Sequence, residues 1–369
     1  MKSLLLLLSL FLLCGCEDSF PPAGDPDAQA LGVNTRIIYS QYLGVDSIGI
    51  FSILPDGTDR RFVAFGTATS SPNHGRIAFV RNTGGTTAVM IARLDGSDTL
   101  TLASVPDTTG RLLRFATLSP RGDRVAYVLH QEMQDSGDAS IFIVDAGGGS
   151  SRMLTSDIVR GGVPYFSPDG SRIAWHTFDG KIRSIMVDGT GLVTVADGAL
   201  VTSELRPTLS WSPSSDRIAY VREIDRVIGE LEVVNIDGTG RRSLTLGLGQ
   251  YIAYPSWSPD GRRIAFIATQ TPSGRDFARV DIWAINVDGT ERERIVEADT
   301  AAPRRERVIA PEWAPDGTSI LYTRHMVGTA YPARGFNRGI GTIEVIALSG
   351  RVMSIELAPN PSFDGFWVR

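Results

Sequence analysis

The chain has 369 residues, of which 42% are hydrophobic and 21% are charged, so it can bury a sizeable core and wholesale disorder is excluded. Its formal net charge of −5 argues against nucleic-acid binding, because nucleic-acid-binding proteins usually carry a basic balance. Both cysteines lie within the first 16 residues. The remaining domain therefore cannot form a disulfide, and its stability must come from packing.

The first residues have the pattern of a secretory signal. Lys2 precedes an apolar run over 4–13, which is too short for a transmembrane helix of about 20 residues. The ending LCGC at 13–16 resembles the bacterial lipobox, which implies cleavage before Cys16 and lipidation of that residue. Acylation at Cys14 is disfavoured because it would place a bulky leucine beside the cleavage site, and an ordinary signal with an incidental cysteine is the other alternative. We predict a signal peptide over 1–15 and a membrane anchor at Cys16.

The segment that follows the predicted anchor has the composition of a flexible tether. Residues 16–34 hold the lipidated cysteine and a stretch rich in Pro, Asp, Ala and Gly, without periodicity. Such a coil gives a mean reach on the order of 20–25 Å. Glu17 stands where the inner-membrane retention signal of enteric bacteria has Asp, which favours sorting to the outer membrane. We expect the folded part to face the periplasm or the cell surface.

One ten-residue phrase recurs through the rest of the chain. It reads F/W-[SA]-P-D-G-x-x-I-[AL]-aromatic at 166–175, 257–266 and 313–322, with degenerate copies after Pro72, Pro120 and Pro213. The six prolines stand 45 to 56 residues apart, and seven copies of a second phrase, ending in Asp-Gly-Thr or a relative, alternate with the first. Pro fixes φ and Asp-Gly forms a tight turn, so each period predicts four short strands. Four short strands in about 45–50 residues are typical of a propeller blade.

These residues carry a family resemblance. The phrase W-S-P-D-G-x-x-I-A-F, followed by D-G-T and L-T, resembles the WD40-like propeller repeat of the TolB family over 36–369. The resemblance implies an all-β propeller of four-stranded antiparallel blades. TolB itself resembles a six-bladed propeller behind an α/β domain, for which this chain leaves no room. We therefore expect a TolB-like propeller that carries a lipid anchor, not TolB.

The two ends of the repeat region predict the number of blades. Residues 36–40 and 48–54 look like second and third strands that lack a first strand, and 361–368 looks like that missing strand. Pairing the two ends would close the ring and hide both sheet edges. We predict one propeller over 35–369 with seven blades, and six blades is the alternative.

Loop lengths differ between the two faces of such a propeller. The Asp-Gly turns join first to second and third to fourth strands, so they lie on one face and are uniformly short. The long connections belong to the opposite face, at 130–139, 222–230, 269–279, 297–310 and 324–341. Divergent loops predict the working surface, and unselected loop drift is the alternative.

One group of residues in these long loops is chemically distinct, and we call it the arginine patch. It comprises Arg304, Arg305, Arg307, Arg324, His325, Tyr331, Arg334, Phe336 and Arg338. Arginine and aromatic side chains suit an acidic peptide, a lipid headgroup or a sugar acid. Exposed arginines that are merely solvated are the alternative.

The sequence offers little for catalysis or metal binding. Some seven-bladed relatives of this repeat are oligogalacturonate lyases, which resemble metal enzymes that use propeller histidines. Of the four histidines, His74 belongs to a turn on the opposite face and His325 lies far around the predicted ring. Only His130 and His176, on adjacent predicted blades, could meet, and two ligands make a weak metal site. We expect buried structural histidines, no metal and no cofactor. Nucleophile, zinc-protease and phosphate-loop motifs are absent from the sequence.

Tryptophan recurs at one repeat position, in Trp211, Trp257 and Trp313, which predicts inter-blade core and not a sugar platform. The sequence thus predicts a monomeric, non-enzymatic scaffold or binding module, anchored at the bacterial envelope and binding a protein partner. The alternative is a carbohydrate-active or carbohydrate-binding propeller that acts on acidic polysaccharide.

Overall fold

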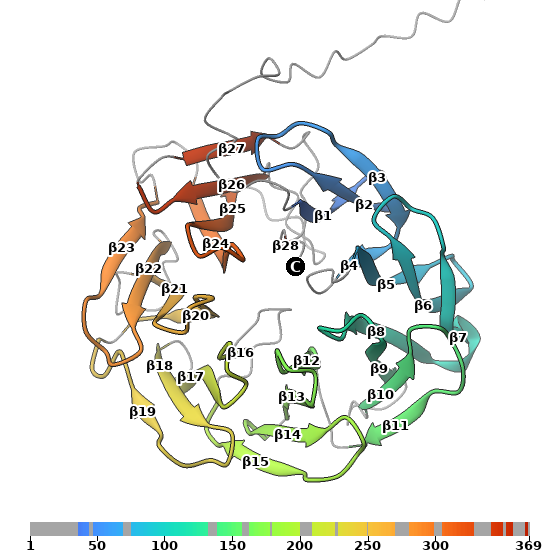
Figure 1. Cartoon of the computed structure of the whole chain (residues 1–369), viewed down its shortest axis with the longest axis horizontal. Coiled ribbons are helices and arrows are strands. Elements are labelled where there is room, and N and C mark those ends of the chain that lie inside the picture. Colours follow the sequence, from blue (N-terminus) through green and yellow to red (C-terminus); the bar gives the residue numbers. More distant parts are fainter. Residues whose placement is uncertain are drawn as a thin grey trace, which may run out of the picture.

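The chain folds into a ring of antiparallel sheets around a central axis. The computed structural model describes residues 36–43, 47–68, 75–131, 139–156, 162–177, 179–199, 209–225, 228–248, 250–269, 280–298, 305–327, 341–349, 352–356 and 366–367. These residues form seven four-stranded sheets, each with its first strand nearest the centre and its fourth strand outside (Figure 1). The predicted all-β propeller is confirmed, with seven blades and not six.

The strands of the first four blades have the following bounds. Blade 1 contains β28 (Phe366–Trp367), β1 (Ile37–Tyr42), β2 (Ile48–Ile53) and β3 (Arg61–Phe65). Blade 2 contains β4 (Thr67–Ala68), β5 (Arg76–Asn82), β6 (Thr86–Arg93) and β7 (Leu100–Pro106). Blade 3 follows a short 3-10 helix, η2 (Asp107–Thr109), and contains β8 (Arg111–Leu118), β9 (Arg124–Gln131), β10 (Ala139–Asp145) and β11 (Arg152–Thr155). Blade 4 contains β12 (Tyr165–Phe166), β13 (Arg172–His176), β14 (Ile182–Met186) and β15 (Val193–Ala196).

The remaining three blades complete the ring. Blade 5 contains β16 (Leu209–Trp211), β17 (Arg217–Asp225), β18 (Ile228–Asn235) and β19 (Arg242–Ser243). Blade 6 contains β20 (Ile252–Trp257), β21 (Arg263–Thr269), β22 (Val280–Asn286) and β23 (Glu293–Val296). Blade 7 contains β24 (Arg305–Trp313), β25 (Ser319–Val327), β26 (Gly341–Ala347) and β27 (Val352–Glu356). No helix among the described residues is long and apolar enough to cross a membrane.

Blade 1 joins the two ends of the repeat region. Strand β28 pairs antiparallel with β1, with Trp367 opposite Ile37 and Phe366 opposite Ile38. Both isoleucines are fully buried. The predicted closure by pairing of the terminal strands is therefore confirmed.

The recurrent Asp-Gly phrases form turns at one end of each blade. In blade 4 the Ser167 hydroxyl donates to the carboxylate of Asp169, which also accepts the backbone N–H of Ser171. Gly170 takes the left-handed conformation that this turn requires, with φ of 72°. The N–H of Val187 donates to the carbonyl of Ser171, which ties the turn between strands three and four to the turn between strands one and two. Both kinds of turn therefore lie on one face of the propeller, which we call the Asp-Gly face.

The core lies between neighbouring blades. The second strand of every blade carries a buried aromatic residue: Tyr39, Phe79, Tyr127, Trp175, Tyr220, Phe266 and Tyr322. Tyr220, for example, packs with Ala174 and Ile182 of the preceding blade. Trp257 packs against Val221 and Leu231 in the same way, and the predicted burial of the recurrent tryptophans is confirmed.

The innermost strands of blades 3, 6 and 7 are bulged. Phe115, Tyr254 and Ala310 have positive φ values of 55°, 56° and 53°, and the register with the second strand shifts beside each of them. Strand β24 begins at Arg305 and pairs with β25 on both sides of its bulge. The predicted loop over 297–310 is therefore wrong in its second half, because the extended β25 offers partners for those backbone groups.

Candidate protein-binding surfaces

The arginine patch begins on strands, not in loops as the sequence suggested. Arg305 and Arg307 lie in β24, while Arg324 and His325 lie in β25. The two strands pair, with Arg307 opposite His325. The structure thus brings four members of the patch onto neighbouring strands of blade 7. The other five members, Arg304, Tyr331, Arg334, Phe336 and Arg338, lie outside the described residues, as does Cys16.

Arg324 has a structural ion pair within blade 7. Its Nε lies 2.8 Å from Oε1 of Glu344, whose side chain is only 7% exposed. The hydroxyl of Tyr322 also donates to Glu344, and burial together with that carboxylate raises the pKa of the tyrosine. Arg324 is only 19% exposed, so much of its charge is already balanced inside the protein. Arg324 therefore stabilises β25, the strand that also carries His325 of the patch.

Blade 5 repeats this arrangement with more partners. Glu232 is buried at the position equivalent to Glu344 and accepts hydrogen bonds from Tyr220, Arg222 and Arg241. Arg222 also donates to the buried Glu230 at 2.6 Å. Burial opposes ionisation of Glu232, but the three hydrogen bonds outweigh it and lower the pKa of the carboxyl. We call these five residues the blade 5 ion network.

Sequence reasoning missed both acidic positions. Each glutamate interrupts the apolar alternation of a third strand, in LEV at 231–233 and in IEV at 343–345. Each also lies directly opposite the second-strand tyrosine, Tyr220 or Tyr322. A glutamate within an otherwise apolar strand was the available signal, since buried carboxylates need paired donors.

The histidines are dispersed around the ring. His176 ends β13 and is buried, and burial lowers its pKa to about 4. His130 lies half-buried on β9 of the neighbouring blade, while His74 and the side chain of His325 lie outside the described part of the structure. Among the described residues no three His, Cys, Asp or Glu side chains are grouped for a metal ion. The predicted burial is confirmed for His176.

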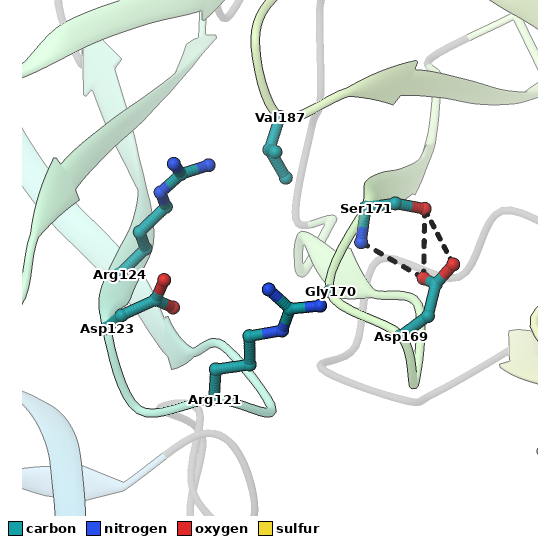
Figure 2. Close-up of a pocket in the computed structure, with 7 residues that line it drawn as sticks. All are labelled: Arg121, Asp123, Arg124, Asp169, Gly170, Ser171 and Val187. Atoms are coloured by element: carbon teal, nitrogen blue, oxygen red, sulfur yellow. Dashed lines mark hydrogen bonds between the residues drawn. The ribbon is translucent and has the colours of Figure 1, made fainter.

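A cavity of about 200 Å³ opens on the Asp-Gly face between blades 3 and 4, and we call it the blade 3–4 cavity (Figure 2). Its lining consists of Arg121, Asp123, Arg124, Asp169, Gly170, Ser171 and Val187. The guanidinium group of Arg121 reaches across from one turn toward Gly170 of the next (Figure 2). The cavity therefore lies where the uniform turns of two blades meet.

The two carboxylates of this cavity are held by the protein. Asp123 accepts the Ser119 hydroxyl at 2.7 Å. Asp169 accepts hydrogen bonds from Ser167 and Ser171, which lower its pKa despite the opposing effect of burial. Among the described residues, neither Arg121 nor Arg124 has a side-chain hydrogen bond or an ion pair. Among the charged side chains that line the cavity, the unused hydrogen-bond donors thus belong to its two arginines.

Part of the chain is similar in sequence to known proteins. No protein-family model matches the chain. A segment is 31% identical over 110 residues to the Tol-Pal system protein TolB of Alcanivorax borkumensis, covering 30% of this chain and 23% of that protein. The chain thus spans less than a quarter of the length of the curated relatives it matches.

Solved structures agree with the chain over most of its length. TolB from Acinetobacter baumannii covers 96% of this chain and 89% of its own, with a TM-score of 0.52 and 16% identity. An oligogalacturonate lyase in complex with manganese covers 87% and 85%, with a TM-score of 0.53 and 12% identity. At these sequence identities the structural similarity shows only that the fold is shared. Together with the matching sequence segment, it makes the chain a TolB-like β-propeller.

Proposed function

We propose that this TolB-like propeller is a lipid-anchored protein of the bacterial envelope that acts as a non-enzymatic scaffold and binds protein partners. The observation that carries the proposal is the TolB-like repeat sequence in a complete seven-bladed ring. The matching relative is named as a component of the Tol-Pal system. A closed ring with its core between the blades supplies a rigid disc on which partners can dock.

The arginine patch is the proposed contact surface. It combines guanidinium groups, which bind carboxylates in bidentate fashion, with aromatic side chains at Tyr331 and Phe336, and both types are enriched in binding hot spots. Arg324 is already paired with Glu344, so we assign most of the contact to Arg334 and Arg338. An acidic segment of an envelope protein is the partner chemistry that fits.

Crosslinked affinity capture from the native envelope tests this surface. The wild type would be compared with an Arg334→Glu/Arg338→Glu variant and with an Arg61→Glu/Arg262→Glu control, whose residues are exposed on the Asp-Gly face. Asp59 keeps its ion pair to Arg36 in the control. We expect a protein captured by the wild type and the control but lost from the patch variant. The same capture by all three proteins would contradict the proposed surface.

The anchor has a separate test. Replacement of Cys16 by Ala is expected to abolish incorporation of radiolabelled fatty acid and to move the protein from the membrane fraction to the soluble fraction. Cys14→Ala is the matched control, because we expect acylation only at Cys16. Sedimentation of the wild type with outer-membrane vesicles would support the proposed location. Fatty acid retained by the Cys16→Ala variant would contradict the anchor.

A further inference from the structure

Blade 3 departs from blades 4, 6 and 7 at the turn that forms the blade 3–4 cavity. In blades 4, 6 and 7 the turn has an aspartate after its proline, and that aspartate accepts the backbone N–H two residues further on. The three pairs are Asp169 with Ser171, Asp260 with Arg262, and Asp316 with Thr318. Blade 3 has Arg121 at this position. A cation cannot accept that hydrogen bond. Blade 5 also lacks the aspartate, and in blades 3 and 5 the serine before the proline donates instead to an aspartate further along the turn, Asp123 or Asp216. The turn of blade 3 is thus held without the side chain of Arg121.

Arg124 departs from its equivalents in a second, independent way. Six blades have an arginine at the start of the second strand or directly before it, and in five of them the guanidinium has an intramolecular partner. Arg36 binds Ser52 and Asp59, Arg76 binds the Ala146 carbonyl, Arg172 binds Ser184 and the Gly191 carbonyl, Arg217 pairs with Asp216 and lies over Trp257, and Arg263 binds Glu293. Arg124 alone among these six has none.

In blade 4 the third strand supplies one of the partners. Arg172 lies opposite Met186, and Ser184 stands two residues before Met186 in the same strand. The hydroxyl of Ser184 accepts the Nε–H of Arg172 at 2.7 Å. The corresponding residue of blade 3 is the buried Ile143, whose side chain has no acceptor. Blades 2, 5 and 6 are also apolar at this position, but their arginines bind an acceptor elsewhere. Arg124 is nevertheless half-buried. The guanidinium nitrogens of Arg124 are not among the buried unpartnered atoms and reach the cavity, so they are available to an external acceptor.

The charges of the cavity indicate which acceptor fits. Arg121 and Arg124 are balanced in number by Asp123 and Asp169, so a singly charged ligand disturbs this balance less than a doubly charged anion such as sulfate. The carboxylates already accept hydrogen bonds from serines, which leaves guanidinium donors as the groups to be satisfied. A carboxylate accepts paired N–H donors from arginine, and a single acidic side chain matches the volume of about 200 Å³.

We propose that the blade 3–4 cavity binds a glutamate or aspartate side chain of a partner polypeptide through Arg121 and Arg124. The choice of a polypeptide rests on the proposed scaffold function, but the site does not depend on the arginine patch, which begins on blade 7. The molecule would then recognise acidic residues at two places, on opposite faces of the propeller.

Nuclear magnetic resonance of the ¹⁵N-labelled arginine Nε–H groups tests the site directly. The probe is a blocked tri-glutamate peptide at low salt, compared with tri-glutamine and with sulfate. We expect tri-glutamate to shift the Nε–H signals assigned to Arg121 and Arg124, and to bind at least about tenfold more tightly than either comparison ligand. Equal binding of tri-glutamine, or shifts confined to other arginines, would overturn the proposal. Stronger binding of sulfate would show a general anion site and would overturn the choice of ligand.

Variants separate the site from general surface charge. Arg121→Asp restores the usual turn residue and Arg124→Ser copies Ser319 of blade 7, so both are expected to keep the melting temperature. Each should weaken tri-glutamate binding about tenfold, while Arg262→Ala, an exposed arginine on the same face, should not change it. Unchanged binding in both cavity variants would refute the site. Arg334→Glu/Arg338→Glu should leave this binding intact even if the proposed function fails, so the two failures can be told apart.

Discussion

The blade 5 ion network shows how much one buried charge can matter. Glu232 is 3% exposed and accepts hydrogen bonds from Tyr220, Arg222 and Arg241. Glu232→Ala would leave two arginines and a tyrosine without that acceptor. We expect the free energy of unfolding to fall by about 3–5 kcal/mol, measured by denaturant titration, because a broken buried pair leaves an uncompensated charge.

An exposed ion pair provides the comparison for Glu232. Arg93 and Asp98 form an ion pair in which both side chains are more than 60% exposed. Water screens this pair, so Asp98→Ala should cost no more than about 1 kcal/mol. Equal losses for the two variants would show that burial does not set the contribution of Glu232.

His176 gives the fold a pH dependence in the weakly acidic range. Burial lowers its pKa from 6.5 to about 4, so the unfolded chain takes up a proton that the folded chain refuses. This contribution to stability is full above about pH 6.5 and is lost as the pH falls toward 4. The loss amounts to about 3 kcal/mol. Denaturant titrations between pH 7 and pH 4 would measure it.

A variant that cannot titrate isolates the histidine. The His176→Gln variant should be less stable than the wild type at neutral pH. Between pH 7 and pH 4, however, its free energy of unfolding should fall by about 3 kcal/mol less than that of the wild type. The carboxyls of Asp169 and Glu232 have lowered pKa values, so their contribution is lost only in more acidic solution. Parallel pH profiles of the two proteins would contradict the assigned protonation of His176.

At the scale of the strand, the tryptophans of the repeat join neighbouring blades. Trp257 ends β20 and packs on Val221 and Leu231 of blade 5, with Arg217 above its ring at 5.0 Å. Trp257→Ala should therefore lower the free energy of unfolding by about 3–5 kcal/mol. The indole Nε1 has no hydrogen-bond partner among the described residues, so Trp257→Phe should cost far less. A near-neutral alanine variant in thermal melting would place the ring at the surface.

The strands were predictable because their signals are local and repeated. Pro168 with Asp169 and Gly170 fixes a turn wherever it occurs, and the apolar alternation around it fixes which face of the strand is buried. The patch on blade 7 was predicted less well, because strand extension at Arg305 depends on a pairing partner distant in sequence. The unpaired state of Arg124 was not predictable at all, since it depends on which acceptors of other strands and neighbouring blades lie within reach of the guanidinium.

At the scale of the whole molecule, stability depends on closing the ring. Every core cluster spans the contact between two blades, including the one that joins Tyr39 of blade 1 to Leu321 of blade 7. An open ring would expose the two faces of one such contact. The backbone pairing of β28 with β1 is the step that prevents this, although it involves only two residue pairs.

Removal of β28 tests the closure. A chain that ends after Glu356 would leave the backbone of Ile37 and Ile38 unpaired at the inner edge of blade 1. We expect it to lose roughly 3–5 kcal/mol of stability and to self-associate, because an unpaired strand edge is a template for pairing with another chain. A chain that ends after Trp367 keeps β28 and should behave as the wild type. Melting curves and light scattering on a sizing column distinguish the two. Both truncations shorten the same terminus. If the two chains were equally stable and both monomeric, the contacts between blades alone would hold the ring closed.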